Sequence, residues 1–246
     1  MPYKGKYIRN KDDSYRISRS KIEDFMKCPR CFYLDRVLGI AKPSSPPFNL
    51  NIAVDHLLKL EFDEYRRQGI PHPMMTANGI DAIPFSHECM DQWRENFVGV
   101  QHLHPETNLL VFGAVDDLWV NPAGELIVVD YKATSKDKEV SLDDDWQVAY
   151  KRQMEIYQWL LRKNGFAVSD TGYFVYCNGK KDRPAFNGVL EFDIKVIPYT
   201  GDSAWVDGTI LDIKNCLDSD CIPDYTDGCE FCKVQGKLME LASQGE

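Results

Sequence analysis

Hydrophobic positions recur at helical spacing through the first part of the chain. In three segments, apolar residues return every three or four positions, which is typical of amphipathic helices. These segments are residues 20–38, 52–68 and 87–98. Ser20 and Glu23 form a capping box at the start of the first segment, and Gly39 and Gly69 follow the first two segments. The start and stop signals therefore agree with the helical pattern.

The period changes near the middle of the chain. Apolar and polar residues alternate over residues 109–120, and residues 126–129 are almost continuously apolar. A turn sequence, Asn-Pro-Ala-Gly, separates the two segments at residues 121–124. This pattern predicts a β-hairpin whose second arm lies centrally in a sheet.

Helical and extended patterns alternate through the rest of the chain. They predict helices over residues 144–163 and 204–217, strands over residues 172–177 and 189–198, and a proline-rich loop at residues 43–47. A tail with several cysteines follows the last helix. The order of elements predicts one α/β domain over residues 1–246, with a mixed sheet flanked by helices.

Composition excludes some classes of protein. The 246 residues are 43% hydrophobic and 27% charged, which suits a globular domain with a sizeable core. No run of about 18 apolar residues occurs, so no membrane span is expected. The polar start of the chain lacks the apolar stretch of a secretory signal. We therefore expect a cytoplasmic protein whose eight cysteines are reduced.

Charge is distributed unevenly along the chain. The net charge is −9, yet residues 1–42 contain 11 Lys and Arg against 5 Asp and Glu. A basic segment on an acidic body can bind a nucleic acid backbone. A solvated tail explains the same counts, so charge alone leaves both interpretations open.

Asp116 falls near the middle of the first predicted hairpin arm, and Asp130 and Lys132 fall at the end of the second. Asp130 and Lys132 are two residues apart on one strand, so they share a face, and the hairpin can bring Asp116 close to them. Two carboxylates can hold a hard cation that activates water for phosphodiester hydrolysis, with the Tyr131 carbonyl as a further oxygen ligand. Lys132 can orient the water or stabilise developing negative charge. A surface salt bridge is the alternative for so short a motif.

Gln153 and Tyr157 lie on one face of the helix predicted at residues 144–163. That face is otherwise aromatic and aliphatic, so a glutamine there needs a hydrogen-bond partner. A carboxylate of the metal site or a phosphate can provide it. A hydrogen-bonded core glutamine is the alternative.

These motifs together resemble the RecB-like branch of the PD-(D/E)XK nucleases, which includes the CRISPR-associated RecB-like exonucleases. The resemblance extends from Cys28 to Cys232. Its motifs are Gly113-x-x-Asp116, Asp130-x-Lys132 and Gln153-x-x-x-Tyr157. It implies a restriction-endonuclease-like fold and a DNA nuclease in which Asp116 and Asp130 bind Mg²⁺ or Mn²⁺. It also implies that Lys132 is catalytic and that Gln153 and Tyr157 support the site or the DNA.

One metal-ligand position departs from that family. The family usually has a histidine on an early helix, and the matching register places Asp55 there, with His56 one residue later. One residue corresponds to about 100° around a helix. Asp55 is the expected third ligand because a carboxylate binds a hard cation well. His56 is the alternative.

Two C-x-x-C pairs lie near opposite ends of the chain. Cys28 and Cys31 form one pair, and Cys229 and Cys232 form the other. Together they can complete a tetrahedral set around one metal site. The family often carries a 4Fe–4S cluster held by one N-terminal and three C-terminal cysteines, so the arrangement of two plus two leaves 4Fe–4S and Zn²⁺ both open. Small buried cysteines without a metal are the other reading.

DNA is the expected partner. A catalytically inactive nucleic-acid-binding protein on the same fold is the alternative. The sequence has no phosphate-binding ATPase motif, so strand opening would need a helicase or another DNA-processing partner.

Overall fold

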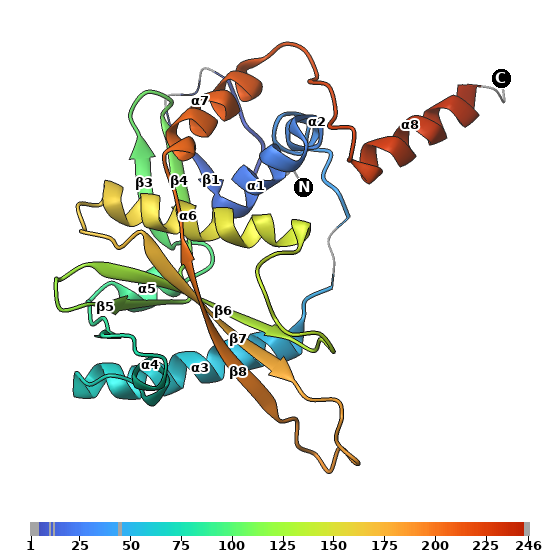
Figure 1. Cartoon of the computed structure of the whole chain (residues 1–246). Coiled ribbons are helices and arrows are strands. Elements are labelled where there is room, and N and C mark those ends of the chain that lie inside the picture. The colour runs from blue at the N-terminus through green and yellow to red at the C-terminus, as the bar shows by residue number, and fades with distance from the viewer. Residues whose placement is uncertain (1–4, 10, 12, 44–45, 244–246) are drawn as a thin grey trace. The chain divides into compact units, whose positions relative to one another are not determined.

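The computed structural model describes residues 5–9, 11, 13–43 and 46–243 (Figure 1). The chain forms two compact units, which we call the terminal unit and the central unit. The terminal unit comprises Met1–Ser45, Leu103–Val111 and Trp205–Glu246, and the central unit comprises Pro46–His102 and Phe112–Ala204. The predicted loop at residues 43–47 and the basic segment 1–42 both include positions outside the described residues. No helix in the described ranges has the length and apolar character needed to cross a membrane.

A mixed five-stranded sheet forms the centre of the central unit. Its order is β2 (Ile83–Pro84), β5 (Asp117–Val120), β6 (Leu126–Thr134), β7 (Thr171–Gly179) and β8 (Phe192–Thr200). The β6–β7 pair is parallel and the other pairs are antiparallel. β6 is nine residues long, and its first six residues, Leu126–Tyr131, are all buried, as its continuous apolar run predicts. The predicted α/β class with a mixed sheet flanked by helices is confirmed.

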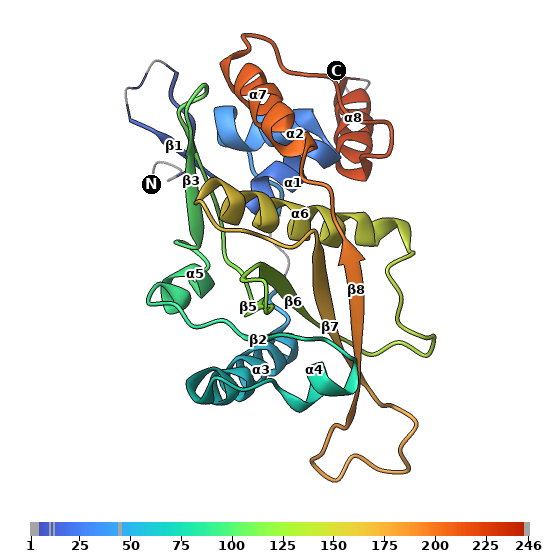
Figure 2. The same ribbon diagram turned by 60° about the vertical axis from the view of Figure 1, so that its left-hand side comes forward.

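Helices cover both faces of this sheet, as Figures 1 and 2 show for α3 and α6. The helical elements of the central unit are α3 (Asn49–Gln68), α4 (Pro73–Ala77), α5 (Met90–Arg94), the 3-10 turn η2 (Asp145–Gln147) and α6 (Val148–Lys163). Because side chains alternate along a strand, Tyr131 faces α3, whereas Asp130 and Lys132 face α6. One face of β6 therefore contributes to a hydrophobic core, whereas the other face carries Asp130 and Lys132.

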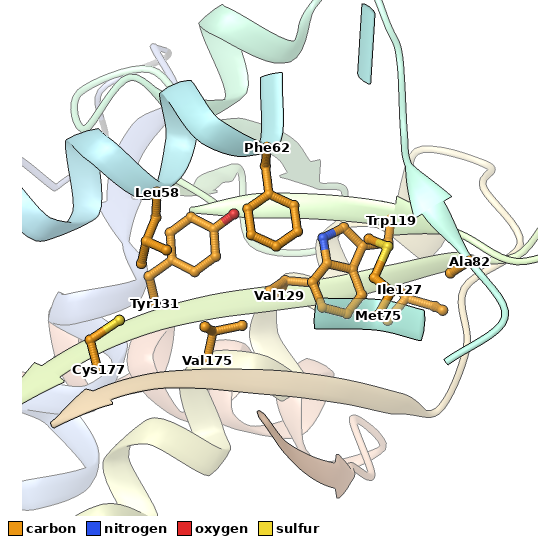
Figure 3. Packing of buried hydrophobic residues seen from close by; sticks show 10 residues of the cluster. All are labelled: Leu58, Phe62, Met75, Ala82, Trp119, Ile127, Val129, Tyr131, Val175 and Cys177. Carbon is orange, nitrogen blue, oxygen red and sulfur yellow. The ribbon is translucent and has the colours of Figure 1, made fainter. Parts of the chain in front are cut away.

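The face beneath α3 is a hydrophobic core built around aromatic rings (Figure 3). Phe62 stacks on Trp119, with ring centroids 5.6 Å apart, and Trp119 stacks on Tyr173 at the same separation. The buried members of this core are Leu58, Phe62, Met75, Ala82, Trp119, Ile127, Val129, Tyr131, Val175 and Cys177. Leu58 and Phe62 are the only two residues of α3 that are buried, so most of the surface of this helix is left exposed.

The opposite face packs closely against α6. This helix buries a continuous run from Gln153 to Leu161. At Gly172 on β7, an added Cβ would overlap the Met154 sulfur and lie 2.8 Å from the Val128 carbonyl oxygen. The absence of a side chain there lets α6 approach the sheet, and this brings the polar end of its buried face to Asp130.

The terminal unit combines helices from both ends of the chain with a small sheet. Its strands are β1 (Tyr15–Ser18), β4 (Leu109–Gly113) and β3 (Val100–His104), in that order, and the latter two extend into the central unit. Its helices are α1 (Arg19–Lys27), α2 (Pro29–Tyr33), the π-helical turn η1 (Leu34–Leu38), α7 (Trp205–Asp218) and α8 (Glu230–Ser243). The cysteine-bearing tail is therefore largely helical.

Two predicted helices differ from the structure. The first begins at Arg19 with Ser18 as its N-cap, so the predicted capping box at Ser20 and Glu23 is wrong. It also breaks at Cys28, which is extended because Pro29 disfavours helical geometry in the preceding residue. The helix predicted at residues 87–98 is reduced to α5, since Glu95 is extended.

The predicted hairpin also differs. Its first arm, residues 109–120, is divided between two sheets: β4 joins the small sheet and β5 joins the large one. Between them, the Val115 N–H donates to the Trp93 carbonyl and not to a neighbouring strand. Alternate positions stay buried through this break: residues 109, 111, 113, 115, 117 and 119 are all buried, although β5 buries Leu118 as well. The second arm is correctly predicted and is longer than expected.

Candidate active site and cysteine cluster

Asp130 lies completely buried at the point where β6 leaves its pairing with β5. Its Oδ1 accepts a hydrogen bond of 2.7 Å from Gln153 Nε2 on α6, and its Oδ2 forms an ion pair with Lys132. The same Gln153 amide donates to the Tyr157 hydroxyl at 3.1 Å. Gln153 thus has a carboxylate as its hydrogen-bond partner, as expected. Gln153 and Lys132 together hold the Asp130 carboxylate in one orientation.

Asp116 lies immediately before β5, where the pairing between β5 and β6 ends. Its Oδ2 accepts a hydrogen bond of 2.9 Å from the Tyr131 N–H. Asp116 therefore takes the place of a main-chain carbonyl where the β5–β6 ladder ends. Its side chain is 22% exposed, which leaves part of the carboxylate open to solvent or to a ligand.

Asp55 on α3 contributes a third carboxylate on the same side as Asp116. Lys59, one turn further along α3, lies 2.7 Å from Asp55 Oδ2 and 3.6 Å from Asp116 Oδ1. Burial, together with the charge of Asp116, raises the pKa of Asp55. The two carboxylates therefore repel one another, and a cation between them relieves that repulsion. His56 is exposed, so the structure brings Asp55 towards Asp116 and leaves His56 on the helix surface.

A small cleft of about 110 Å³ lies beside these groups. It is lined by Asn51, Val54, Asp55, Tyr131, Lys132, Ala133 and Tyr150. Asp55 lines it directly, and Asp116 and Asp130 contact its lining residues Tyr131 and Lys132. Carboxylate oxygens are ligands that Mg²⁺ and Mn²⁺ prefer. This donor set fits a hard divalent cation, with the Lys59 ammonium between two of the carboxylates.

Lys132 is charged despite its burial. Burial alone would lower the pKa of its ammonium, but the carboxylates of Asp130 and Asp116 outweigh that effect and raise it. The ammonium also lies 4.4 Å from the centre of the Tyr150 ring. Lys132 is therefore a fixed positive charge at the wall of the cleft and acts chemically as a hydrogen-bond donor, not as a base.

A buried charge network behind the cleft was not predicted from the sequence. Asp117 is completely buried and accepts hydrogen bonds from Arg66 and Arg94. It also accepts a hydrogen bond of 2.7 Å from the Tyr131 hydroxyl. Arg94 donates in addition to the Asp116 carbonyl at 3.1 Å. Burial and the charge of Asp117 raise the pKa of Tyr131, so its hydroxyl stays protonated. This network holds the Asp116 backbone through Arg94 and the Tyr131 side chain through its hydroxyl.

The four cysteines of the two C-x-x-C pairs meet within the terminal unit. Their sulfurs all lie within 4.8 Å of one another, and the Cys31 sulfur is 3.5 Å from that of Cys229 and 3.3 Å from that of Cys232. Sulfurs that share one tetrahedral zinc ion are about 3.8 Å apart, given a Zn–S bond of about 2.3 Å. The Cys28–Cys232 separation is 3.8 Å. The cluster therefore fits a metal held by four thiolates.

The local environment favours a thiolate at one of these cysteines. Burial raises the pKa of the Cys28 thiol, but hydrogen bonds from the backbone of Cys31 and Thr226 outweigh burial and lower it to about 7. Burial raises the pKa of Cys232 to about 11. Among the described residues, Cys216 and Cys221 are not members of the cluster. A cysteine must lose its proton to bind a metal ion, so metal binding at this cluster would release protons.

A family model matches most of the chain. The profile of the PD-(D/E)XK nuclease superfamily matches residues 50–236. No match is found among curated proteins. Among solved structures, the chain is similar to the crystal structure of SSO0001, at 17% identity and a TM-score of 0.40, over 87% of this chain and 80% of that one. Because the profile covers most of the chain, and includes the three carboxylates and Lys132, this protein belongs to the PD-(D/E)XK nuclease superfamily.

Proposed function

We propose that this protein is a metal-dependent deoxyribonuclease that hydrolyses phosphodiester bonds in single-stranded or end-containing DNA. The observation that carries the proposal is that Asp55 and Lys132 line one cleft, with Asp116 beside Asp55 and Asp130 paired with Lys132. Membership of the nuclease superfamily supports the class of reaction. The RecB-like resemblance of the motifs supports the choice of DNA and of single strands or ends.

Asp55, Asp116 and Asp130 would hold Mg²⁺ or Mn²⁺, together with the Tyr131 carbonyl. When bound, the ion polarises the scissile phosphate and makes an attacking water more acidic. Asp55 is favoured over His56 because it alone of the two faces Asp116. Gln153 acts as a positioning residue, since it holds Asp130 Oδ1 while its own amide is anchored to Tyr157.

Lys132 has the role that its charge and location support. Its ammonium can donate to the attacking water or to a phosphate oxygen as negative charge grows in the transition state. The pair with Asp130 keeps it protonated at neutral pH. The proposed mechanism therefore uses the carboxylates for the cation and the lysine for charge stabilisation.

The proposed activity and substrate class can be tested together with wild-type protein. Labelled linear single-stranded DNA, circular single-stranded DNA and blunt duplex are incubated with Mn²⁺, Mg²⁺ or EDTA. We expect cutting of the linear single strand with either metal and none with EDTA, because the proposed metal ligands are hard oxygen donors. Resistance of the circle would indicate a need for ends. Folded protein that binds DNA but cuts no substrate with any metal would support a binding protein on this fold.

We also propose that Cys28, Cys31, Cys229 and Cys232 hold a structural metal group, either Zn²⁺ or 4Fe–4S. Its role would be to join α2 to the start of α8, as the sulfur contacts suggest. A helicase or another DNA-processing protein remains a proposed partner, since the sequence has no ATPase motif of its own.

Removing one cysteine ligand is expected to release the metal and lower the stability of the terminal unit. Cys31→Ser should lose the bound metal and several kcal/mol of unfolding free energy, because metal binding contributes directly to folding. The matched control, Cys221→Ser, changes an exposed cysteine outside the cluster and should behave as wild type. Elemental analysis together with visible absorption distinguishes zinc from an iron–sulfur cluster. Metal-free wild-type protein, prepared without oxygen and as stable as the metal-loaded form, would contradict the proposal.

A further inference from the structure

Two aromatic side chains, with a lysine at each end, form a row that leads outwards from the cleft. The Lys132 ammonium lies 4.4 Å from the centre of the Tyr150 ring, and the Tyr150 and Trp146 rings meet edge to face at 5.2 Å. The Lys136 ammonium then lies 4.6 Å from the centre of the Trp146 ring. All four residues belong to the central unit. Through the Tyr150 ring, the row connects the candidate catalytic residue Lys132 to Trp146 at the surface.

Trp146 is held firmly although its side chain is 51% exposed. Its indole N–H donates to the Asp144 carboxylate at 3.2 Å, and Lys136 donates to the same oxygen at 3.0 Å. Asp144 and Gln147 form the capping box of the turn that carries Trp146. Gln147 is completely buried and donates to the Tyr176 hydroxyl at 3.1 Å. The turn is therefore fixed to the sheet while the indole is presented to solvent.

A fixed and exposed indole beside a nuclease cleft is suited to stacking a nucleobase. Stacking on an aromatic side chain contributes substantially to single-strand binding and accepts any base, because every base has a π face. A side chain that is already ordered loses little conformational entropy when it binds. Inside a duplex, by contrast, the faces of the bases are covered by their neighbours. Trp146 can therefore stack on an unpaired base but not on a base within a duplex.

We propose that Trp146 and Lys136 form a subsite for an unpaired nucleotide of the strand that occupies the cleft. The base stacks on the indole, and Lys136 turns from Asp144 to the adjoining phosphate. Asp143 and Asp145 flank this surface with exposed carboxylates. Stacking, more than charge, must therefore provide the affinity. The inference rests on the proposed nuclease function, and it assigns the preference for single-stranded DNA to one side chain.

Binding in the absence of cutting tests this subsite. Fluorescence polarisation is measured in EDTA and in Ca²⁺, with a short labelled single strand and a blunt duplex of the same sequence. Trp146→Leu keeps an apolar side chain without a π face and should weaken single-strand binding by roughly five- to a hundredfold, with duplex binding unchanged. Trp146→Phe should retain most of the affinity. The control Phe97→Leu makes the same kind of change at an exposed phenylalanine and should bind as wild type.

Abasic substitutions identify the contacted nucleotide. An abasic site placed at one position of the strand should weaken binding by wild type, whereas Trp146→Leu should be insensitive at that position. Single-strand binding by Trp146→Leu equal to wild type would overturn the proposal, as would an equal loss for duplex or a wild type that does not bind single strands. Because no cutting is required, a wild type that binds as described yet cleaves nothing would defeat the nuclease proposal and leave the subsite standing.

Discussion

Replacing Lys132 by methionine is expected to reduce the rate of DNA cleavage by at least about a hundredfold, with little loss of metal binding. Methionine keeps most of the aliphatic side chain but removes the ammonium that faces Asp130 and the cleft. The transition state then loses a hydrogen-bond donor at the point where negative charge develops. Single-turnover cleavage at saturating Mn²⁺ separates this chemical effect from any change in metal affinity.

The matched control for this variant is Lys163→Met. Lys163 also lies over an aromatic ring, that of Trp159, but at the far end of α6. Its replacement should leave cleavage unchanged. A folded Lys132→Met protein whose single-turnover rate stays within about threefold of wild type would remove the lysine from the proposed mechanism.

Replacing Asp117 by asparagine is expected to have the largest effect on stability. The change leaves the buried guanidinium groups of Arg66 and Arg94 without their shared fully buried carboxylate. Breaking a buried ion pair by removing one partner costs about 3–5 kcal/mol. The Tyr131 hydroxyl loses its charged acceptor at the same time. Urea unfolding monitored by circular dichroism measures the loss directly.

Asp63→Asn provides a close comparison for that experiment. Asp63 pairs with the same two arginines, but its side chain is 36% exposed, so water can replace the lost contact. We expect a loss well below that of Asp117→Asn. Equal losses in the two variants would show that burial of Asp117 is not what makes the network important. Below its unfolding transition, Asp117→Asn should also cleave more slowly, because Arg94 and Tyr131 orient Asp116.

The parts of the site that follow local periodicity could be predicted from the sequence. Asp130 and Lys132 were expected on one face of a strand, and Gln153 was expected to seek a polar partner. Both contacts occur in the structure. The register around Asp55 and His56 follows the same reasoning, since one residue on a helix changes the direction of a side chain by about 100°. The catalytic and ligand roles of these residues remain predictions.

The parts that depend on long-range packing could not be predicted. Arg66 and Arg94 have no local signal of burial, because their acidic partner, Asp117, lies on a strand more than twenty residues away from either. The alternation over residues 109–120 does not reveal that β4 and β5 join different sheets. The helix predicted at residues 87–98 fails for a related reason: Phe97 is 85% exposed and so contributes no buried face.

Cleavage of labelled single-stranded DNA by wild type and by Asp130→Asn, side by side in Mn²⁺ and in EDTA, tests the central claim most directly. Asparagine preserves the shape of the buried side chain but removes the charge that Gln153 and Lys132 hold in place. We predict that wild type cuts only with Mn²⁺ and that Asp130→Asn, folded as shown by its thermal unfolding, does not cut. Cleavage by wild type that persists in EDTA, or equal cleavage by a folded Asp130→Asn protein, would contradict the account.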